Sequence, residues 1–175
     1  MFITFHKLYS SYFFLKKNDI NLSCLLNCYK NGNRKFYPKH IEMNKLIDLN
    51  VKGDKRGKLI AIEDFEIPFK IKRIFYIFDT SNNVQRGVHS HIKTKQILIA
   101  IHGSCKIVLD DGVKKETFIL ENNRKALFQD KMVWGNISEF SADCVLLVLA
   151  DSPYDKSDYI FNYQVFLSEL KINNS

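Results

Sequence analysis

The residues with the clearest chemical potential are two histidines separated by one residue. They stand in the segment 86–91 (RGVHSH) and are two of the five histidines in the chain. In a β-strand, side chains alternate between the two faces, so His89 and His91 would point the same way. Two imidazoles on one face suit three roles: two ligands of a metal ion, a general acid/base pair, or a hydrogen-bonded pair without chemistry.

A tight metal site needs more ligands than this pair supplies. The position where a carboxylate would complete such a site holds Gln96, a neutral amide. The later strand-like segment 130–136, around Trp134, contains no histidine. Two imidazoles and an amide are a poor ligand set for a divalent cation. We therefore expect no metal ion and no other cofactor.

Neighbouring polar residues favour acid/base chemistry over inert packing. Arg86 adjoins the pair, and the strand-like segment 73–76 contributes Arg73 and Tyr76. A cavity lined by such groups is costly to desolvate, and proteins usually tolerate that cost for a ligand or a reaction. Imidazole accepts a proton near neutral pH. Arginine or tyrosine could stabilise an enediolate formed by proton abstraction next to a carbonyl. The inert pair stays open as an alternative.

The elements that must position these residues are short strands. From residue 58 onward, runs rich in Ile, Val, Phe and Leu alternate with turn signals, of which 110–112 (DDG) is the strongest. Many short strands without intervening helices indicate a sandwich, jelly roll or small barrel. The predicted strands are 46–51, 58–63, 70–79, 87–91, 95–102, 104–110, 114–121, 125–129, 132–137 and 143–150.

A helix is predicted after Pro153. Its apolar residues recur at helical spacing, which predicts a helix that starts near Ser157 and packs on the outside of the barrel. Ser157 is the expected N-cap, and Asp158 in the first turn suits the helix dipole. The apolar face comprises Tyr159, Ile160, Tyr163, Phe166, Leu167 and Leu170.

The first 42 residues differ from the rest. Seven lysines and arginines against two acidic residues give them a net charge of +5 out of +7 for the chain. They show no sustained helical or strand period, so we expect a basic extension over 1–42 and a domain over 43–175. One hypothesis is that the working protein begins at Met43. The remaining +2 argues against nucleic-acid binding by the domain.

The cysteine spacing and the hydropathy pattern indicate the cellular compartment of the protein. Cys24, Cys28, Cys105 and Cys144 lack Cys-x-x-Cys spacing, which favours free thiols in a reducing cytoplasm. No apolar run reaches the roughly 20 residues that span a bilayer. The start of the chain lacks the basic and apolar regions of a secretory signal. We expect a cytoplasmic protein without membrane contact.

Seven segments carry a resemblance to a known family: 73–79, 86–91, 96–99, 103–106, 109–112, 140–150 and 154–160. Together they resemble the dTDP-4-oxo-6-deoxyglucose 3,4-ketoisomerases, over about residues 43–170. The resemblance implies an all-β cupin-type double-stranded β-helix, or jelly roll, with a short C-terminal helix. It also implies a homodimer that exchanges N-terminal strands. The activity implied is metal-free: the keto group of a dTDP-linked 4-keto-6-deoxyhexose moves from C4 to C3 through an enediol(ate), on the way to dTDP-3-amino-3,6-dideoxyhexoses.

The resemblance also implies roles for single residues. The family's catalytic histidine pair falls on His89 and His91, and its tyrosine on Tyr76. One histidine, with His91 favoured, would move the proton from C3 to C4, and the other would relay a proton between the two oxygens. The substrate-binding residues implied or proposed are Arg56, Arg73, Arg86, Gln96 and Trp134.

The chain departs from the family's pattern next to the tryptophan. A charged or imidazole residue and a glutamate usually follow it, whereas Gly135 and Asn136 follow Trp134 here. This change bears on how the sugar is held and leaves the C4 configuration of the product open. Two alternatives remain, a non-catalytic sugar-nucleotide-binding cupin and a related 3,5-epimerase.

Overall fold

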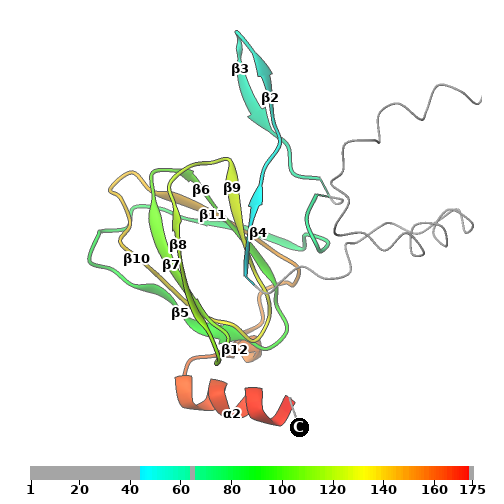
Figure 1. Ribbon diagram of the computed structural model, residues 1–175, viewed down its shortest axis with the longest axis vertical. Helices are drawn as coiled ribbons and strands as arrows, with labels where there is room; N and C mark the ends of the chain where they lie inside the picture. Colours follow the sequence, from blue (N-terminus) through cyan, green and yellow to red (C-terminus); the bar gives the residue numbers. More distant parts are fainter. Residues whose placement is uncertain (1–43, 64–65, 174–175) are drawn as a thin grey trace, which may run out of the picture. The chain divides into compact units, whose positions relative to one another are not determined.

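The computed structural model describes residues 44–63 and 66–173 (Figure 1). The predicted extension 1–42, with Cys24 and Cys28, lies outside them. The described chain is built almost entirely from short strands, as predicted. Its elements are β1 (Lys45–Asp48), β2 (Val51–Asp54), β3 (Gly57–Ile60), β4 (Arg73–Ile77), β5 (Arg86–His91), β6 (Gln96–His102), β7 (Cys105–Asp110), β8 (Lys115–Leu120), β9 (Lys125–Gln129), β10 (Trp134–Ser138), β11 (Val145–Ala150), a 3-10 helix (Lys156–Asp158), β12 (Tyr159–Ile160) and α2 (Tyr163–Asn173).

Two five-stranded antiparallel sheets face each other and form a jelly roll (Figure 1). The strand order is β1-β9-β6-β11-β4 in the first sheet and β12-β5-β10-β7-β8 in the second. Strands that neighbour each other in a sheet are mostly distant in the sequence, as in β6 and β11. The predicted all-β jelly roll with a C-terminal helix is confirmed.

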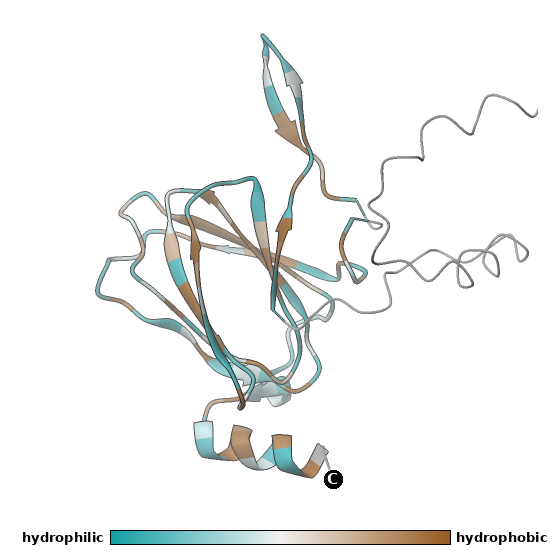
Figure 2. Ribbon diagram, viewed as in Figure 1, coloured by the Kyte–Doolittle hydropathy of each residue, from teal (hydrophilic) through white to brown (hydrophobic). Residues whose placement is uncertain are grey.

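Two apolar clusters hold the fold together. The first lies between the sheets and includes Leu98 and Ala100 of β6. The second lies on the outer face of the first sheet, where Ile67 and Phe69 cover Ile97 and other residues. Because β6 is buried on both faces, its sequence reads as the continuous apolar run that Figure 2 shows in brown.

A hairpin of β2 and β3 stands away from the two sheets (Figure 1). Its strands pair only with each other, from Val51 with Ile60 to Asp54 with Gly57. The strand predicted over 46–51 is therefore wrong as one element: β1 joins the first sheet through β9, and β2 starts the hairpin. A two-stranded hairpin on its own is marginally stable in water.

The C-terminal segment differs from the helix predicted from near Ser157. The Asp155 carboxylate accepts a hydrogen bond from the backbone N–H of Ser157, which closes a 3-10 turn instead. Tyr159 and Ile160 then pair with β5 as an extended strand. The Asn162 side chain accepts from the N–H groups of residues 164 and 165 and so caps α2. The helix does pack on the outside of the barrel, through the fully buried Phe166.

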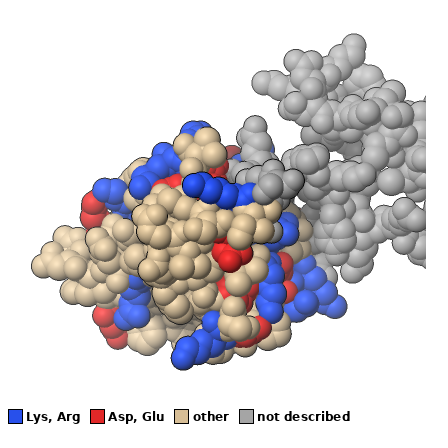
Figure 3. Space-filling view, turned by 90° about the horizontal axis from the view of Figure 1, so that it is seen from below, with Lys and Arg blue, Asp and Glu red and all other residues tan. Residues whose placement is uncertain are grey.

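Two further predictions concern thiols and membranes. Cys105 and Cys144 are buried free thiols, as predicted. Within the described part of the chain, no helix has the length and apolar character to cross a membrane. The face that Figure 3 shows carries basic and acidic side chains interspersed, without a large patch of one sign.

Candidate active site

A cavity of about 320 Å³ lies between the two sheets. Strands of both sheets contribute to it, and its walls combine apolar side chains with an imidazole, a guanidinium and two amides. His89 is the titratable ring that faces this space. The lining residues are Phe75, Ile77, Arg86, Gly87, His89, Gln96, Leu98, Gln129, Gly135, Ile137 and Val148.

The two histidines meet on the inner face of β5, as the alternation predicts. Their Nε2 atoms are 3.2 Å apart. His89 is half-buried and lines the cavity, whereas His91 lies behind it and is only 2% exposed. Tyr159 packs against both rings, with centroid distances of 4.8 Å to His89 and 4.4 Å to His91. The pair is therefore fixed, and one member reaches the cavity.

A buried carboxylate stands behind His91. The Oδ2 atom of Asp158 lies 3.1 Å from Nδ1 of His91, and both side chains are 3% exposed. The hydroxyl of Thr94 donates to the same oxygen, and the backbone N–H of Lys93 donates to Oδ1 at 2.8 Å. The amide of Gln96 lies 3.2 Å from Nε2 of His91. The result is a hydrogen-bonded chain from Asp158 through His91 to His89.

The surroundings keep both imidazoles neutral near pH 7. Burial lowers the pKa of His89 from 6.5 to about 4, with a further lowering by His91 and an opposing effect of Asp158. Burial also lowers the pKa of His91, although the charge of Asp158 and its hydrogen bond oppose this. A neutral imidazole has a free lone pair, so His89 can accept a proton from a molecule in the cavity.

The lowered pKa of His89 predicts a loss of stability in mild acid. The unfolded chain protonates His89 near pH 6.5 and the folded chain only near pH 4, so between these values the unfolded state binds the extra proton. The free energy of unfolding should therefore fall from pH 7 to pH 5. Urea unfolding at both pH values should show a smaller fall in the His89→Gln variant. An equal fall in both proteins would contradict this prediction.

Of the two arginines predicted near the histidines, Arg86 lines the cavity and Arg73 does not. Gly87 has a φ of +64°, and the register of β5 shifts there, which brings Arg86 onto the inner face opposite Ile137. Arg73 lies on the inner face of β4 with its guanidinium 5.1 Å from the ring centre of Phe75. Its Nε atom is buried and has no hydrogen-bond partner among the residues that the structure describes. Arg73 is thus available for an anionic group of a ligand.

Tyr76 and Trp134 do not join the histidines. Tyr76 is 61% exposed on the outer face of β4, because Phe75 and Ile77 take the inner positions. Trp134 points outward from β10 and packs on α2, with its ring 5.3 Å from that of Tyr163. In one subunit, Tyr76 belongs to the outer surface of the first sheet and Trp134 anchors the helix. The roles predicted for them in catalysis and in substrate binding stay predictions.

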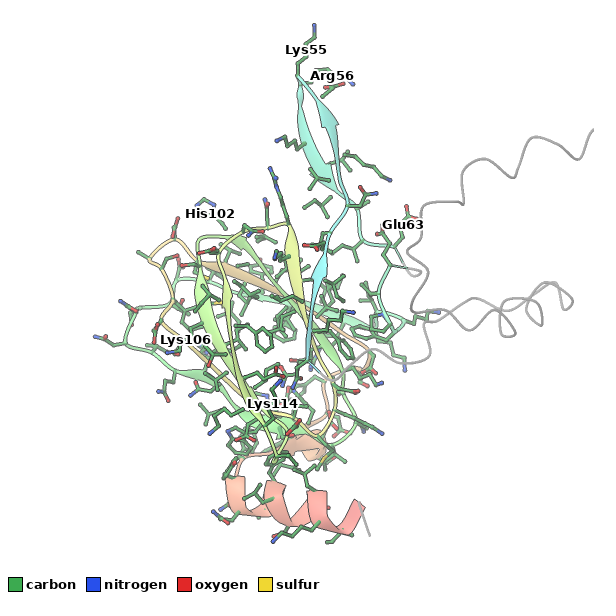
Figure 4. The ribbon with its side chains drawn as sticks, viewed as in Figure 1. Lys55, Arg56, Glu63, His102, Lys106 and Lys114 are labelled. Atoms are coloured by element: carbon green, nitrogen blue, oxygen red, sulfur yellow. The ribbon has the colours of Figure 1, made fainter. Side chains whose placement is uncertain are left out.

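Arg56 also lies apart from the cavity. It stands at the tip of the β2–β3 hairpin, where Figure 4 shows it next to Lys55, and it pairs with Asp54 at 2.7 Å. In one subunit, Arg56 cannot contact a molecule beside His89. Its predicted role as a pyrophosphate or sugar contact stays a prediction.

Sequence reasoning missed the residues that surround the histidine pair from distant segments. Asp158 and Tyr159 belong to the segment 154–160, which the resemblance identified without assigning it a role. No pattern in the sequence identified Thr94 as a site residue. Among residues 44–63 and 66–173, no three His, Cys, Asp or Glu side chains are grouped to hold a metal ion. The arrangement is suited to moving protons.

Comparison with known proteins gives the family. A protein-family model described as FdtA, WxcM-like, C-terminal, matches residues 42–171. The TDP-4-oxo-6-deoxy-alpha-D-glucose-3,4-oxoisomerase of Aneurinibacillus thermoaerophilus is 43% identical over 132 residues. The match covers 74% of this chain and 95% of that relative.

Solved structures point the same way. A 3,4-ketoisomerase from Helicobacter canadensis is 42% identical with a TM-score of 0.72, over 74% of this chain and 99% of that chain. A 3,4-ketoisomerase from Thermoanaerobacterium thermosaccharolyticum, solved as a histidine-to-asparagine mutant with TDP-4-keto-6-deoxyglucose, is 37% identical with a TM-score of 0.72, over 76% and 97%. A dTDP-4-dehydrorhamnose 3,5-epimerase from Bacillus anthracis, 15% identical with a TM-score of 0.59, shares the fold alone. The chain therefore belongs to the FdtA-like family of sugar 3,4-ketoisomerases.

Proposed function

We propose that this protein moves the keto group of a dTDP-linked 4-keto-6-deoxyhexose from C4 to C3. The observation that carries this proposal is the imidazole of His89 at the cavity wall with His91 and Asp158 hydrogen-bonded behind it. We assign the activity to the domain 43–175. Its buried free thiols suit a reducing compartment such as the cytoplasm.

In the proposed mechanism His89 works at the carbon atoms. It removes the proton from C3, the electrons of the C–H bond form a C3=C4 double bond, and the C4 oxygen takes up a proton to give an enediol. The C3 hydroxyl then loses its proton, a C3 carbonyl forms, and His89 returns a proton to C4. Hydrogen has moved from C3 to C4 and from one oxygen to the other, so the reaction needs no oxidant or reductant.

Exposure decides between the two histidines. The ring of His91 is buried behind His89 and contacts Asp158, so His89 is the ring that a sugar in the cavity would touch. This proposal makes His89 the base at carbon, whereas the roles implied by the family resemblance favoured His91. His91 then serves as the relay behind it: it can take a proton from Nε2 of His89 and return it, without touching the sugar.

Two arginines and an amide would bind the diphosphate and the enediolate oxygen of the substrate. Arg86 lines the cavity and is itself exposed, which suits a contact to the diphosphate of the nucleotide. Arg73 lies outside the cavity lining but near enough to His91 for its charge to oppose protonation of that ring. A guanidinium there would stabilise the developing enediolate oxygen. Gln96 would donate to the sugar from the adjoining wall.

We further propose that two copies of the chain assemble through the first sheet and the hairpin. Exposed apolar side chains crowd the outer face of β4, among them Tyr76 and Phe78, and Leu59 is exposed on the hairpin. A mostly apolar groove of about 330 Å³ joins the hairpin to that face, lined in part by Ile60 and Leu147. The hairpin of one copy would dock on the other and bring Arg56 to the partner's site.

The dimer predicts that Leu59→Lys weakens self-association at least about tenfold, since a lysine head group would be desolvated in the interface. Light scattering after size exclusion across a dilution series would measure the change in mass. Val113→Lys is the matched control, because Val113 is 97% exposed on the β7–β8 turn. A wild-type monomer, or equal association of the two variants, would contradict the proposal.

The function itself is tested with the full chain and dTDP-4-keto-6-deoxyglucose. Proton NMR should show the C3 keto sugar appearing with and without a chelator, and deuterium from solvent should enter at C4. A sugar-nucleotide-binding module would bind without exchange, and an epimerase would invert a carbon and keep the carbonyl at C4. Either result would overturn the proposal.

A further inference from the structure

We propose that Asp158 is a positioning residue that sets the tautomer of His91, and thereby the direction in which the histidine pair passes protons. This inference rests on the proposed isomerase function. It assigns a chemical role to the segment 154–160, which otherwise connects the last long strand to the C-terminal helix.

The groups that contact the Asp158 carboxylate are hydrogen-bond donors or can act as donors. Its Oδ1 receives the backbone N–H of Lys93 at 2.8 Å, and its Oδ2 receives the hydroxyl of Thr94. Oδ2 also lies 3.1 Å from Nδ1 of His91. An ionised carboxylate accepts hydrogen bonds and cannot donate them. The hydrogen of neutral His91 therefore sits on Nδ1, and its lone pair on Nε2.

That tautomer of His91 determines which nitrogen of His89 carries the hydrogen. Nε2 of His91 can only accept, and the groups that lie 3.2 Å from it are Nε2 of His89 and the amide nitrogen of Gln96. His89 then carries its hydrogen on Nε2 and keeps Nδ1 as its basic atom. When Nδ1 takes a proton from the substrate, the Nε2 proton can pass to His91, whose positive charge would face Asp158.

The backbone around Asp158 is organised to hold this contact. Asp155 closes the 3-10 turn that presents Asp158, and the carbonyl of Asp158 accepts the N–H of Ile92 at 2.9 Å, next to His91. The carboxylate is thus locked to β5 through both its side chain and its main chain. A lost charge there would not be compensated by a shift of the turn.

The Asp158→Asn substitution would reverse the direction of the hydrogen bonds that run from residue 158 through His91 to His89. The N–H of Lys93 can only donate, so the amide oxygen must take the position of Oδ1 and the NH₂ group must face Thr94 and His91. His91 would then accept a hydrogen bond at Nδ1 and carry its hydrogen on Nε2. That hydrogen would face the donor groups of His89 and Gln96, which is unfavourable. The shape of the side chain is kept, so the change is one of proton placement.

We expect Asp158→Asn to lower kcat roughly 10- to 100-fold with little change in KM, because Asp158 does not line the cavity. The pH dependence of kcat should also change. This pH dependence would follow the protonation of His91. The charged groups that act on the pKa of His91 are Asp158, Arg73 and Asp151, and His89 is its titratable neighbour.

Asp110→Asn is the matched control. Asp110 is another buried carboxylate, 5% exposed, which accepts from the Tyr163 hydroxyl at 2.8 Å and lies outside the histidine chain. If Asp158 served stability alone, both variants would lose melting temperature and both would keep kcat and the wild-type pH profile. That outcome would overturn the proposal.

A second measurement determines the tautomer of His91 in the wild-type protein. In the full chain labelled with nitrogen-15 histidine, NMR should show His91 protonated at Nδ1 and bare at Nε2, with the signals assigned from their loss in His91→Gln. A hydrogen on Nε2 of His91 would overturn the proposal. If the wild-type protein failed to convert the dTDP-linked sugar, the proposed function would fail, while the tautomer would still be decided.

Discussion

Replacing His89 by glutamine is expected to lower kcat roughly 10⁴-fold, the upper end of what a positioned acid/base group supplies. The reason is that in the proposed mechanism one ring both removes the C3 proton and returns a proton to C4. Glutamine keeps a polar side chain of similar length and cannot take up a proton. No other imidazole of the described residues lines the cavity, so no neighbour replaces the lost base.

Two readouts separate this loss from misfolding or lost binding. NMR should show neither C3 ketone nor deuterium at C4, while calorimetry should show dTDP binding within a few-fold of wild type. His102→Gln is the control: His102 pairs with Asp143 at 3.2 Å, its side chain is 69% exposed, and it stands away from the cavity (Figure 4). Turnover by His89→Gln within tenfold of that control would refute the role of His89.

The pairing of the histidines could be predicted because strand alternation is a local property. His89 and His91 are two residues apart, so any strand containing both places them on one face. The all-β class followed from equally local signals, since β6 to β9 are short apolar runs divided by turns. The family resemblance then supplied the substrate class, which no local pattern contains.

The outward placement of Tyr76 and Trp134 has a common cause. Both residues stand on strands with apolar side chains on either face, because the first sheet carries a second apolar cluster outside and α2 covers the outer face of β10. Alternation assigns such residues to a face, but it does not say which face is inside. That information lies in the packing of segments far apart in the sequence.

Long-range contacts also explain what was missed. Asp158 is 67 residues from His91, and the helix expected at Ser157 would have turned this segment away from β5. The sequence favours a helix there by its apolar spacing, whereas the Asp155 side chain and the pairing of β12 with β5 stabilise the alternative. Arg86 reached the cavity through the bulge at Gly87, which alternation alone does not predict.

The second large effect concerns Gly135, which faces His89 directly across the β5–β10 ladder. It is buried in the cavity wall, and a Cβ atom there would lie 3.2 Å from the amide nitrogen of Gln129 and 3.3 Å from the carbonyl oxygen of Gly87. The Gln129 amide can move, but the carbonyl belongs to the bulge that places Arg86. Any longer side chain at 135 must therefore extend into the space beside His89, where the sugar would sit.

We expect Gly135→Ala to cost several-fold in kcat/KM and Gly135→Leu at least about 10²-fold, since misplacing a reacting group by an ångström has an effect of this size. Steady-state kinetics with dTDP-4-keto-6-deoxyglucose would measure both. Ser138→Leu is the control, because it places the same leucine side chain on β10 on the face away from the cavity. The graded loss should appear with a melting temperature close to that of the control. If Gly135→Leu kept wild-type kcat/KM, the sugar would not occupy the space between His89 and β10, and the substrate site would have to lie elsewhere.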